Sequence, residues 1–214
     1  KRITMQKVEQ FKPDVIIIGS GLAGLTTAME VTNAGKKVLL VDQETEENLG
    51  GQAYWSFGGL FLINSPQQRR MGIKDSYELA RQDWMGTAGF DREEDYWPRQ
   101  WAEAYLKFAT EEKSAYIAKL GIKLMFMVGW AERGDGSASG HGNSVPRFHV
   151  SWGTGTGVVK PFVDKAYAAQ EKGLLQFRFR HRVTKLLTQD GAVIGIGGDI
   201  LADDHQARGV ATNR

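Results

Sequence analysis

The sequence predicts an α/β fold built on a parallel sheet, and three neighbouring segments carry that prediction. Residues 14–19 contain an unbroken Val/Ile run, which indicates a short strand buried on both faces. A glycine-rich turn follows, then a helix expected over 25–33, with Gly35 placed to end it. Residues 38–41 form a second apolar run. Strand, helix and strand in this order make a βαβ unit over 14–42, whose strands are expected to be parallel neighbours.

The bulk composition excludes several classes of function. The 214 residues suffice for one good-sized domain. A formal charge of +2 gives no electrostatic case for nucleic acid or an anionic membrane, and no apolar run approaches the length of a membrane span. The chain has no cysteine, which suits a reducing compartment, and we expect a cytoplasmic protein. The four histidines show no metal-ligand spacing, so no metal site is expected.

The rest of the chain alternates between helical and strand patterns. A helical segment is expected over 75–121, where Asp75 and Glu78 give a capping-box signal for a helix to about Met85. Pro98 suits the start of a second helix and Gly121 its end. Further elements are expected over 122–200: a strand over 122–128, a loop over 133–147, a short strand over 148–152, a helix over 158–172 and a strand over 176–180.

A hairpin is the clearest signal in the last part of the chain. Two apolar runs, 182–188 and 192–196, flank Asp190-Gly191, which is a favoured two-residue hairpin turn. After the hairpin the sequence continues as LADDHQARGVATNR and stops on polar residues.

The turn after the first strand is a G-x-G-x-x-G motif in its full strand–turn–helix context. Its residues are Gly19, Ser20, Gly21, Leu22, Ala23 and Gly24. In such a motif the first glycine makes the tight turn, the second lets a pyrophosphate reach bare backbone, and the third lets the helix pack closely. The helix N-terminus offers N–H groups to the phosphates. Asp42, at the end of the second strand, can accept hydrogen bonds from ribose and would repel a 2′-phosphate.

A second glycine-rich stretch indicates which of two dinucleotide cofactors, NAD or FAD, the chain binds. The segment ENLGGQAYWSFGG, residues 47–59, opens a loop expected over 47–65. NAD needs little further bare backbone here, whereas FAD, which is longer, needs a second stretch of it. Gly50-Gly51 can pass close to the pyrophosphate and ribityl chain, and Gly58-Gly59 can lie against the flavin ring. Three aromatic residues lie between the pairs, and both packing near the ring and plain core packing remain open for them: Tyr54, Trp55 and Phe57.

Three stretches of the chain resemble a known family. They read DVIIIGSGLAGLTTAMEVTNAGKKVLLVDQE, then GGQAYWSFGG, then HRVTKLLTQDGAVIGI. Together they resemble the flavoproteins of the fumarate reductase and succinate dehydrogenase family, and most of all the bacterial FAD-binding dehydrogenases grouped with 3-ketosteroid dehydrogenases. The resemblance implies an FAD-binding, Rossmann-type fold. One departure is that Asn48 and Gln52 stand where many such flavoproteins carry arginine.

The resemblance also implies further site residues and a longer protein. It places a backbone contact to adenine at Val183 and a substrate contact at His149, for which a histidine bonded locally near a strand is the favoured alternative. In this family a capping domain and the catalytic acid or base lie beyond the part matched here. The chain is therefore expected to be the N-terminal part of a longer enzyme, without the capping domain, and no catalytic residue is assigned.

The sequence thus predicts an FAD-dependent oxidoreductase that moves hydride through flavin N5, across a C–C bond next to a carbonyl or carboxylate. Its partners would be a small-molecule substrate and an electron acceptor of unknown identity. An NAD-dependent dehydrogenase and a non-catalytic dinucleotide-binding fragment are the alternatives. The expected cofactor contacts are Gly19, Ser20, Gly21, Ala23, Gly24, Asp42, Gln43, Gly50, Gly51, Gln52, Ser56, Gly58, Gly59 and Val183.

Overall fold

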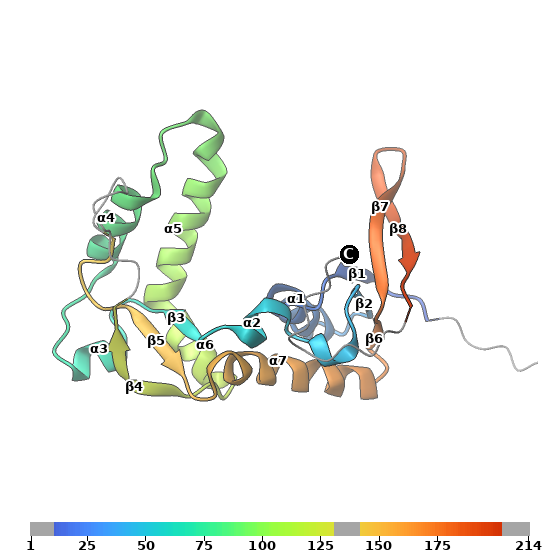
Figure 1. The fold of residues 1–214 in the computed structure, drawn as a ribbon. Helices are drawn as coiled ribbons and strands as arrows, with labels where there is room; N and C mark the ends of the chain where they lie inside the picture. Colours follow the sequence, from blue (N-terminus) through green and yellow to red (C-terminus); the bar gives the residue numbers. More distant parts are fainter. Residues whose placement is uncertain (1–10, 131–141, 203–214) are drawn as a thin grey trace, which may run out of the picture. The chain divides into compact units, whose positions relative to one another are not determined.

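Figure 1 shows the fold in a computed structural model, which describes residues 11–130 and 142–202. These residues form two compact units. The first unit comprises 11–53 and 162–202, and the second comprises 54–130 and 142–161. The polar tail after the hairpin and most of the loop expected over 133–147 lie outside the described residues.

A three-stranded parallel sheet forms the centre of the first unit. Its order is β1 (Val15–Ile18), β2 (Val38–Val41) and β6 (Leu175–Arg178), so β2 has a neighbour on each side. Helix α1 (Leu22–Asn33) joins β1 to β2 and begins at Leu22 rather than Leu25. The predicted βαβ unit and its parallel strand pair are confirmed.

The predicted burial of the first strand on both faces is wrong for the described structure. Ile17 is 8% exposed, whereas Ile16 and Ile18 are 37% and 52% exposed. Ile17 lies under the start of α1, where a side chain at Gly24 would come within 3.4 Å of it. Side chains alternate across β1, so Ile16 and Ile18 lie on the face opposite to Ile17, and that second face stays open within the described part of the chain.

The remaining elements of the first unit include the second helix and the hairpin. Helix α7 (Thr154–Glu171) belongs to this unit from Phe162 onward, and its Ala168 and Ala169 line one small cavity with Met29 of α1. Strands β7 (His181–Gln189) and β8 (Ala192–Ile200) form the predicted hairpin. Asp190 and Gly191 have φ of 49° and 79°, the positive values that a two-residue type I′ turn needs.

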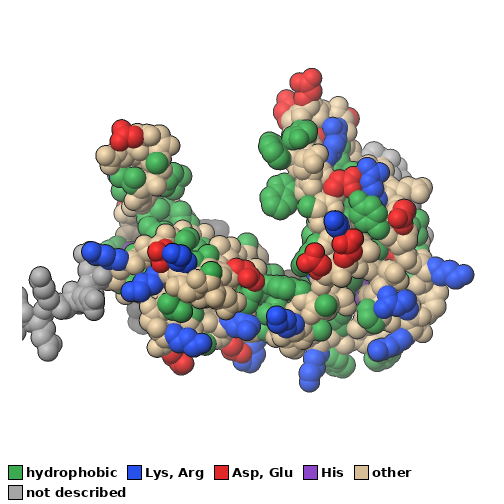
Figure 2. All heavy atoms as spheres, turned by 180° about the vertical axis from the view of Figure 1, so that it is seen from behind, with side chains coloured by type: hydrophobic (Ala, Val, Ile, Leu, Met, Phe, Trp, Pro, Cys, Tyr) green, Lys and Arg blue, Asp and Glu red, His purple; other side chains and the backbone are tan. Residues whose placement is uncertain are grey.

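The hairpin exposes apolar side chains at its surface (Figure 2). Its exposed large residues are Leu186, Leu187, Val193, Ile194 and Ile200. Within the described part of the chain, no helix is both long and apolar enough to cross a membrane.

The second unit combines an antiparallel sheet with helices. The sheet has the order β3 (Gly59–Phe61), β5 (Phe148–Ser151) and β4 (Leu124–Gly129). Its other elements are α3 (Pro66–Arg70), α4 (Tyr77–Ala88), η2 (Glu93–Asp95), α5 (Tyr96–Glu111) and α6 (Lys113–Lys119). The short η1 (Glu46–Asn48) belongs to the first unit, and α2 (Gly51–Trp55) spans the boundary between the units in the chain. A core of Ile63, Ala80, Leu106 and Ala109 lies between β3 and the helices.

Two details of the predicted helical segment are wrong. Helix α4 is capped by Ser76, whose side chain accepts a hydrogen bond from the Leu79 N–H, and not by Asp75. Asp75 instead turns inward to a buried arginine. The single helix expected to end at Gly121 is also divided, because the chain bends at Glu112 between α5 and α6.

A buried arginine organises the polar interior of the second unit. Arg147 is fully buried and binds Asp75 with two hydrogen bonds, from Nε at 2.9 Å and from a terminal nitrogen at 2.8 Å. Its other terminal nitrogen lies 2.6 Å from Asp83 of α4 and 2.8 Å from the Asn143 side-chain oxygen. Two carboxylates thus share one guanidinium, and its pKa is raised by these hydrogen bonds and charges against the lowering effect of burial.

His149 continues this network on the next inward position of β5. It is fully buried, and its Nδ1 donates to the Arg147 carbonyl at 2.8 Å, since a carbonyl can only accept. Its Nε2 therefore accepts from the Ser65 hydroxyl at 2.7 Å. Ser65 also caps α3 through the Gln68 N–H. Burial lowers the pKa of His149, so the neutral ring is the form that fits.

We expect Arg147→Met to lower the free energy of unfolding by about 3–5 kcal/mol, because it leaves two carboxylates buried without their cation. Arg182→Met is the matched control. Arg182 binds Asp199 at 2.9 Å in an exposed ion pair, and its loss should cost about 1 kcal/mol or less. Urea unfolding of both variants measures the difference. Equal, small losses would show that the buried cluster does not stabilise the fold.

We expect the stability of the protein to fall below about pH 6.5, the ordinary histidine pKa, partly through His149. The folded state holds His149 with a lowered pKa, so acid protonates the unfolded state first and favours it. The contribution is at most about 1.4 kcal/mol per pH unit. In urea titrations at several pH values, His149→Gln should show a shallower acid loss than wild type. Parallel curves would remove His149 from the acid response.

Candidate functional site

The turn between β1 and α1 brings helix and strand into close contact. Gly19 has a φ of 96°, which glycine adopts at little cost. A Cβ on Gly24 would lie 1.9 Å from the Gly19 carbonyl oxygen. Only glycine therefore fits at the third position, and its absence of a side chain lets α1 start directly against the turn.

The second glycine of the motif borders open space at the N-terminus of α1. A Cβ on Gly21 would meet no described atom within 4 Å. Gly21 is the N-cap of α1, which has no side-chain cap and no acidic residue in its first turn. Ala23 in that turn is exposed. The first N–H groups and the positive end of the helix are thus left available to an anion.

Asp42 ties the glycine turn to the end of β2. One carboxylate oxygen accepts from the Ser20 N–H and the Ser20 hydroxyl, and the other accepts from the Glu44 N–H at 2.8 Å. The carboxylate is partly exposed and retains lone pairs beyond these bonds. Gln43 next to it is exposed, and its carbonyl accepts from Arg180 at 3.2 Å. Asp42 therefore positions the turn and can still accept from a ligand hydroxyl.

The first pair of the second glycine stretch joins the same turn. The Gly50 N–H donates to the Ser20 carbonyl at 3.0 Å, and Gly50 forms an isolated parallel bridge with Gly21. A Cβ on Gly51 would lie 3.3 Å from the Gly21 Cα. Gln52 follows on α2 with its side chain exposed. Segments 19–24 and 50–52, distant in the sequence, thus form one backbone-lined cradle in the first unit.

The second pair has a packing role within the second unit. A Cβ on Gly58 would lie 2.4 Å from the Thr154 carbonyl carbon, and one on Gly59 would lie 1.9 Å from the Phe148 ring. The Ser56 hydroxyl accepts from the Gly58 N–H at 3.1 Å. Internal contacts alone therefore require both glycines. Their expected place against a flavin ring stays a prediction.

The aromatic residues between the two pairs do not form a closed core. Trp55 and Phe57 are 52% and 68% exposed in the described structure. Phe57 stacks on Phe148 with a centroid distance of 6.1 Å, and Tyr54 meets Trp55 edge-on at 5.3 Å. Plain core packing, which the sequence left open, does not describe Trp55 and Phe57.

Val183 lies on β7, the strand whose first residue is hydrogen-bonded to the residue that follows β2. The N–H of His181, the first residue of β7, donates to the Asp42 carbonyl at 2.8 Å. Val183 pairs with Gly198 of β8 and lines a cavity of about 240 Å³ with Leu39 of β2. Val183 thus lies two residues after the His181 N–H that binds Asp42, the predicted ribose contact, and the predicted adenine contact at Val183 stays a prediction.

His149 faces inward in the second unit, where both ring nitrogens bind protein atoms. Its predicted substrate contact stays a prediction, and the bonds seen hold β5 against α3. Among the described residues, no group of His, Asp or Glu side chains is arranged to hold a metal ion.

Sequence reasoning missed the residues that hold the site together. Ser20 was predicted as a cofactor contact, but its bond to Asp42 was not predicted, and its hydroxyl fixes the orientation of that carboxylate. The backbone bond from His181 to Asp42 joins residues 139 positions apart. No local pattern signals such a contact. A serine next to the first glycine and an acid at the end of the second strand are the only sequence hint.

Comparisons with known proteins agree with this geometry. The family model described as FAD binding domain matches residues 14–214. A KsdD-like steroid dehydrogenase of Mycobacterium tuberculosis is 52% identical over 206 residues, which cover 96% of this chain and 36% of that protein. One of Mycolicibacterium smegmatis is 54% identical over 201 residues, covering 94% and 36%. The chain thus spans about a third of the length of these relatives.

Solved structures show the same fold. A 3-ketosteroid-Δ4-(5α)-dehydrogenase from Rhodococcus jostii, in complex with 4-androstene-3,17-dione, aligns with a TM-score of 0.67 at 23% identity. It covers 90% of this chain and 43% of its own. A flavocytochrome c3 fumarate reductase aligns with a TM-score of 0.64 at 23% identity, covering 86% and 29%. With its α/β sheet and its motif matched over residues 14–214, this chain belongs to the FAD binding domain family.

Proposed function

We propose that this chain is the cofactor-binding part of an FAD-dependent oxidoreductase that acts on a C–C bond next to a carbonyl or carboxylate. The observation that carries the proposal is the cradle at Gly21. There an uncapped helix N-terminus meets open space, and the Gly50 backbone lies beside it. Membership of the FAD binding domain family supports FAD as the cofactor.

The residues of the cradle fit the parts of a dinucleotide. The N–H groups at the start of α1 would bind the pyrophosphate, which could reach them because Gly21 has no side chain. Asp42 would accept from ribose hydroxyls, held in position by Ser20. The backbone of Val183, on the strand that begins beside Asp42, would contact adenine. The start of α1 and the Asp42 carboxylate are groups that the fold leaves accessible.

FAD, when bound, supplies hydride transfer at its N5 atom. The part of this chain is to hold the cofactor and to fix its orientation. Asp42 disfavours a 2′-phosphate by charge, and α1 favours the pyrophosphate through its dipole. The acid or base for substrate chemistry is not assigned to any residue of this chain.

The relatives indicate the substrate class. Two proteins more than half identical to this chain are named KsdD-like steroid dehydrogenases, so we propose a small, apolar ketone of steroid type as the substrate of the whole enzyme. The electron acceptor and the direction of the reaction are left open. A cytoplasmic location remains a prediction from the sequence.

The two alternatives make different predictions for the bound ligand. An NAD-dependent dehydrogenase would leave the second glycine stretch without a cofactor role, although Gly58 and Gly59 have packing reasons of their own. A binding fragment without activity would hold the cofactor and show no turnover. Identification of the bound ligand distinguishes the NAD-dependent dehydrogenase from the proposed FAD enzyme. Turnover with an artificial electron acceptor distinguishes the inactive binding fragment from it.

We expect the longest natural polypeptide that contains this sequence to be purified with a flavin absorption band and to release FAD on denaturation. Gly21→Val should abolish flavin retention, because the side chain would occupy the space predicted for the pyrophosphate. Gly86→Val on α4 is the matched control, since a Cβ there also meets nothing within 4 Å, and it should retain flavin. Full flavin content in Gly21→Val would refute the placement, and released NAD would refute FAD.

A further inference from the structure

The turn between β6 and β7 contains an arginine in a backbone conformation that arginine rarely adopts. Arg180 has a φ of 59°, in the left-handed region that favours glycine and asparagine. A residue with a long side chain takes this conformation at a cost in free energy, so the surrounding contacts must hold it there. Residues held in this way gather at functional sites. The contacts of Arg180 therefore indicate what the position does.

Residues 180 and 181 bind three successive carbonyls of the loop that follows β2. The Arg180 N–H donates to the Glu44 carbonyl at 3.1 Å, and one terminal nitrogen of its guanidinium donates to the Gln43 carbonyl at 3.2 Å. The His181 N–H donates to the Asp42 carbonyl at 2.8 Å. The loop that carries the proposed ribose-binding carboxylate is thus held at each of its first three carbonyls.

The rest of the Arg180 guanidinium holds the chain that leaves the hairpin. Its Nε and its second terminal nitrogen donate to the Ala202 carbonyl at 3.0 Å and 2.7 Å. The Arg180 carbonyl accepts from the Leu201 N–H at 2.7 Å. One residue therefore joins loop 42–44 to the end of the hairpin. Strand β7, which begins at the next residue, carries Val183.

A guanidinium suits this position because its donors lie in one rigid plane and point in different directions. Two carbonyls from different segments can be bound by it at the same time, in one fixed arrangement. A lysine ammonium on a flexible stem would not fix their relative position. Each of the three nitrogens of Arg180 binds a backbone carbonyl, so Arg180 acts through the segments that it joins.

We propose that Arg180 is a positioning residue for the adenosine half of the cofactor. It holds the loop of Asp42, the proposed ribose contact, against the strand of Val183, the proposed adenine contact. Groups that are fixed in advance lose less entropy when a ligand binds, so this arrangement strengthens binding without a contact between Arg180 and the cofactor. The proposal rests on the proposed function, because it takes a dinucleotide to bind at Gly21.

Arg180→Asn tests the proposal in the longest natural polypeptide that contains this sequence, with any bound flavin removed. Asparagine accepts the left-handed conformation but is too short to join the two carbonyls. The Kd for FAD, from flavin fluorescence, and the Kd for ADP, from calorimetry, should both rise about threefold to tenfold, the effect of about one net hydrogen bond. Unchanged FAD affinity, or a loss for FAD with none for ADP, would overturn the proposal.

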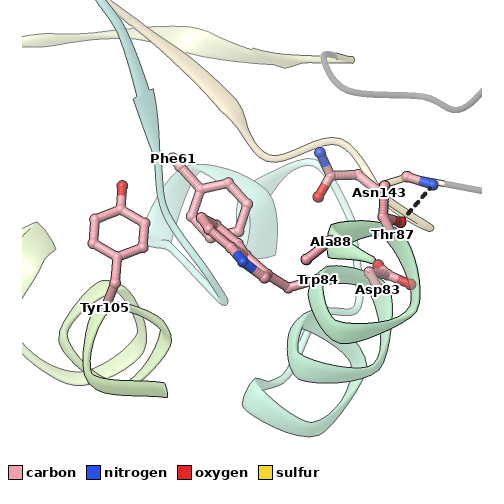
Figure 3. Close-up of a pocket in the computed structure, with 8 residues that line it drawn as sticks. Phe61, Asp83, Trp84, Thr87, Ala88, Tyr105 and Asn143 are labelled. Carbon is pink, nitrogen blue, oxygen red and sulfur yellow. Dashed lines mark hydrogen bonds between the residues drawn. The ribbon is translucent and has the colours of Figure 1, made fainter. Parts of the chain in front are cut away.

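Two control variants separate positioning from general effects. Asp190→Asn makes the same residue at another positive φ, 49°, in the turn at the other end of the hairpin. Thr87 lines a cavity in the second unit and accepts from the Gly142 N–H at 3.2 Å, the bond dashed in Figure 3. Thr87→Val should lower the urea midpoint, and neither control should change the Kd for FAD or ADP. A loss in either control equal to that of Arg180→Asn would mean that Arg180 has no specific role in binding.

Hydrogen exchange gives a readout that needs no cofactor. The N–H groups of Ser20 and Glu44 both donate to the Asp42 carboxylate. Arg180→Asn should speed their exchange about threefold or more, because the loop is no longer held, whereas Asp190→Asn should not. Unchanged exchange would contradict the positioning role even if FAD affinity fell. Wild-type protein that binds neither FAD nor ADP would refute the proposed function, and the exchange rates would still decide whether Arg180 holds Asp42.

Discussion

One aspartate joins the segments on which the proposed cofactor site depends. The side chain of Asp42 binds Ser20 of the glycine turn, while its backbone N–H donates to Arg178 of β6 and its carbonyl accepts from His181 of β7. Residue 42 therefore fixes the turn after β1, the end of β2 and the start of the hairpin at once. A carboxylate used in this way is oriented before any ligand arrives, which lowers the entropy cost of binding. These hydrogen bonds of Asp42 thus help to fix the shape of the cradle at Gly21.

The glycines around the site fall into two physical classes. Gly21 has open space where a side chain would lie. Packing of the fold therefore does not require glycine there, whereas a ligand in that space would require it. Gly24, Gly58 and Gly59 would each place a Cβ less than 2.5 Å from another atom, so the fold itself needs them. Ligand binding and packing thus leave the same residue type in the sequence for opposite reasons, and only the surroundings of each position separate them.

Local patterns predicted much of the fold, and long-range contacts account for what they missed. The βαβ unit and the hairpin depend on neighbouring residues, and both were predicted correctly. The inward turn of Asp75 depends on Arg147, 72 positions away, so a capping box was the natural but wrong reading of that segment. The open face of β1 depends on which elements pack on the sheet, which no single run of residues encodes. Within the site, the motif residues were predicted, whereas the bonds from Ser20 and His181 to Asp42 were not.

The order in which the units can fold follows from the connectivity of β2. Its second neighbour, β6, begins at Leu175, so this central strand waits for more than 130 residues of synthesis before it is paired on both sides. The second unit is continuous in sequence and can fold first during synthesis, since domains generally fold as units from the N-terminal side. Until β6 has been synthesised, the apolar strands β1 and β2 remain incompletely covered on the ribosome. Slow, non-local pairing of this kind exposes a chain to aggregation, and expression at lower temperature or with chaperones acts on that interval.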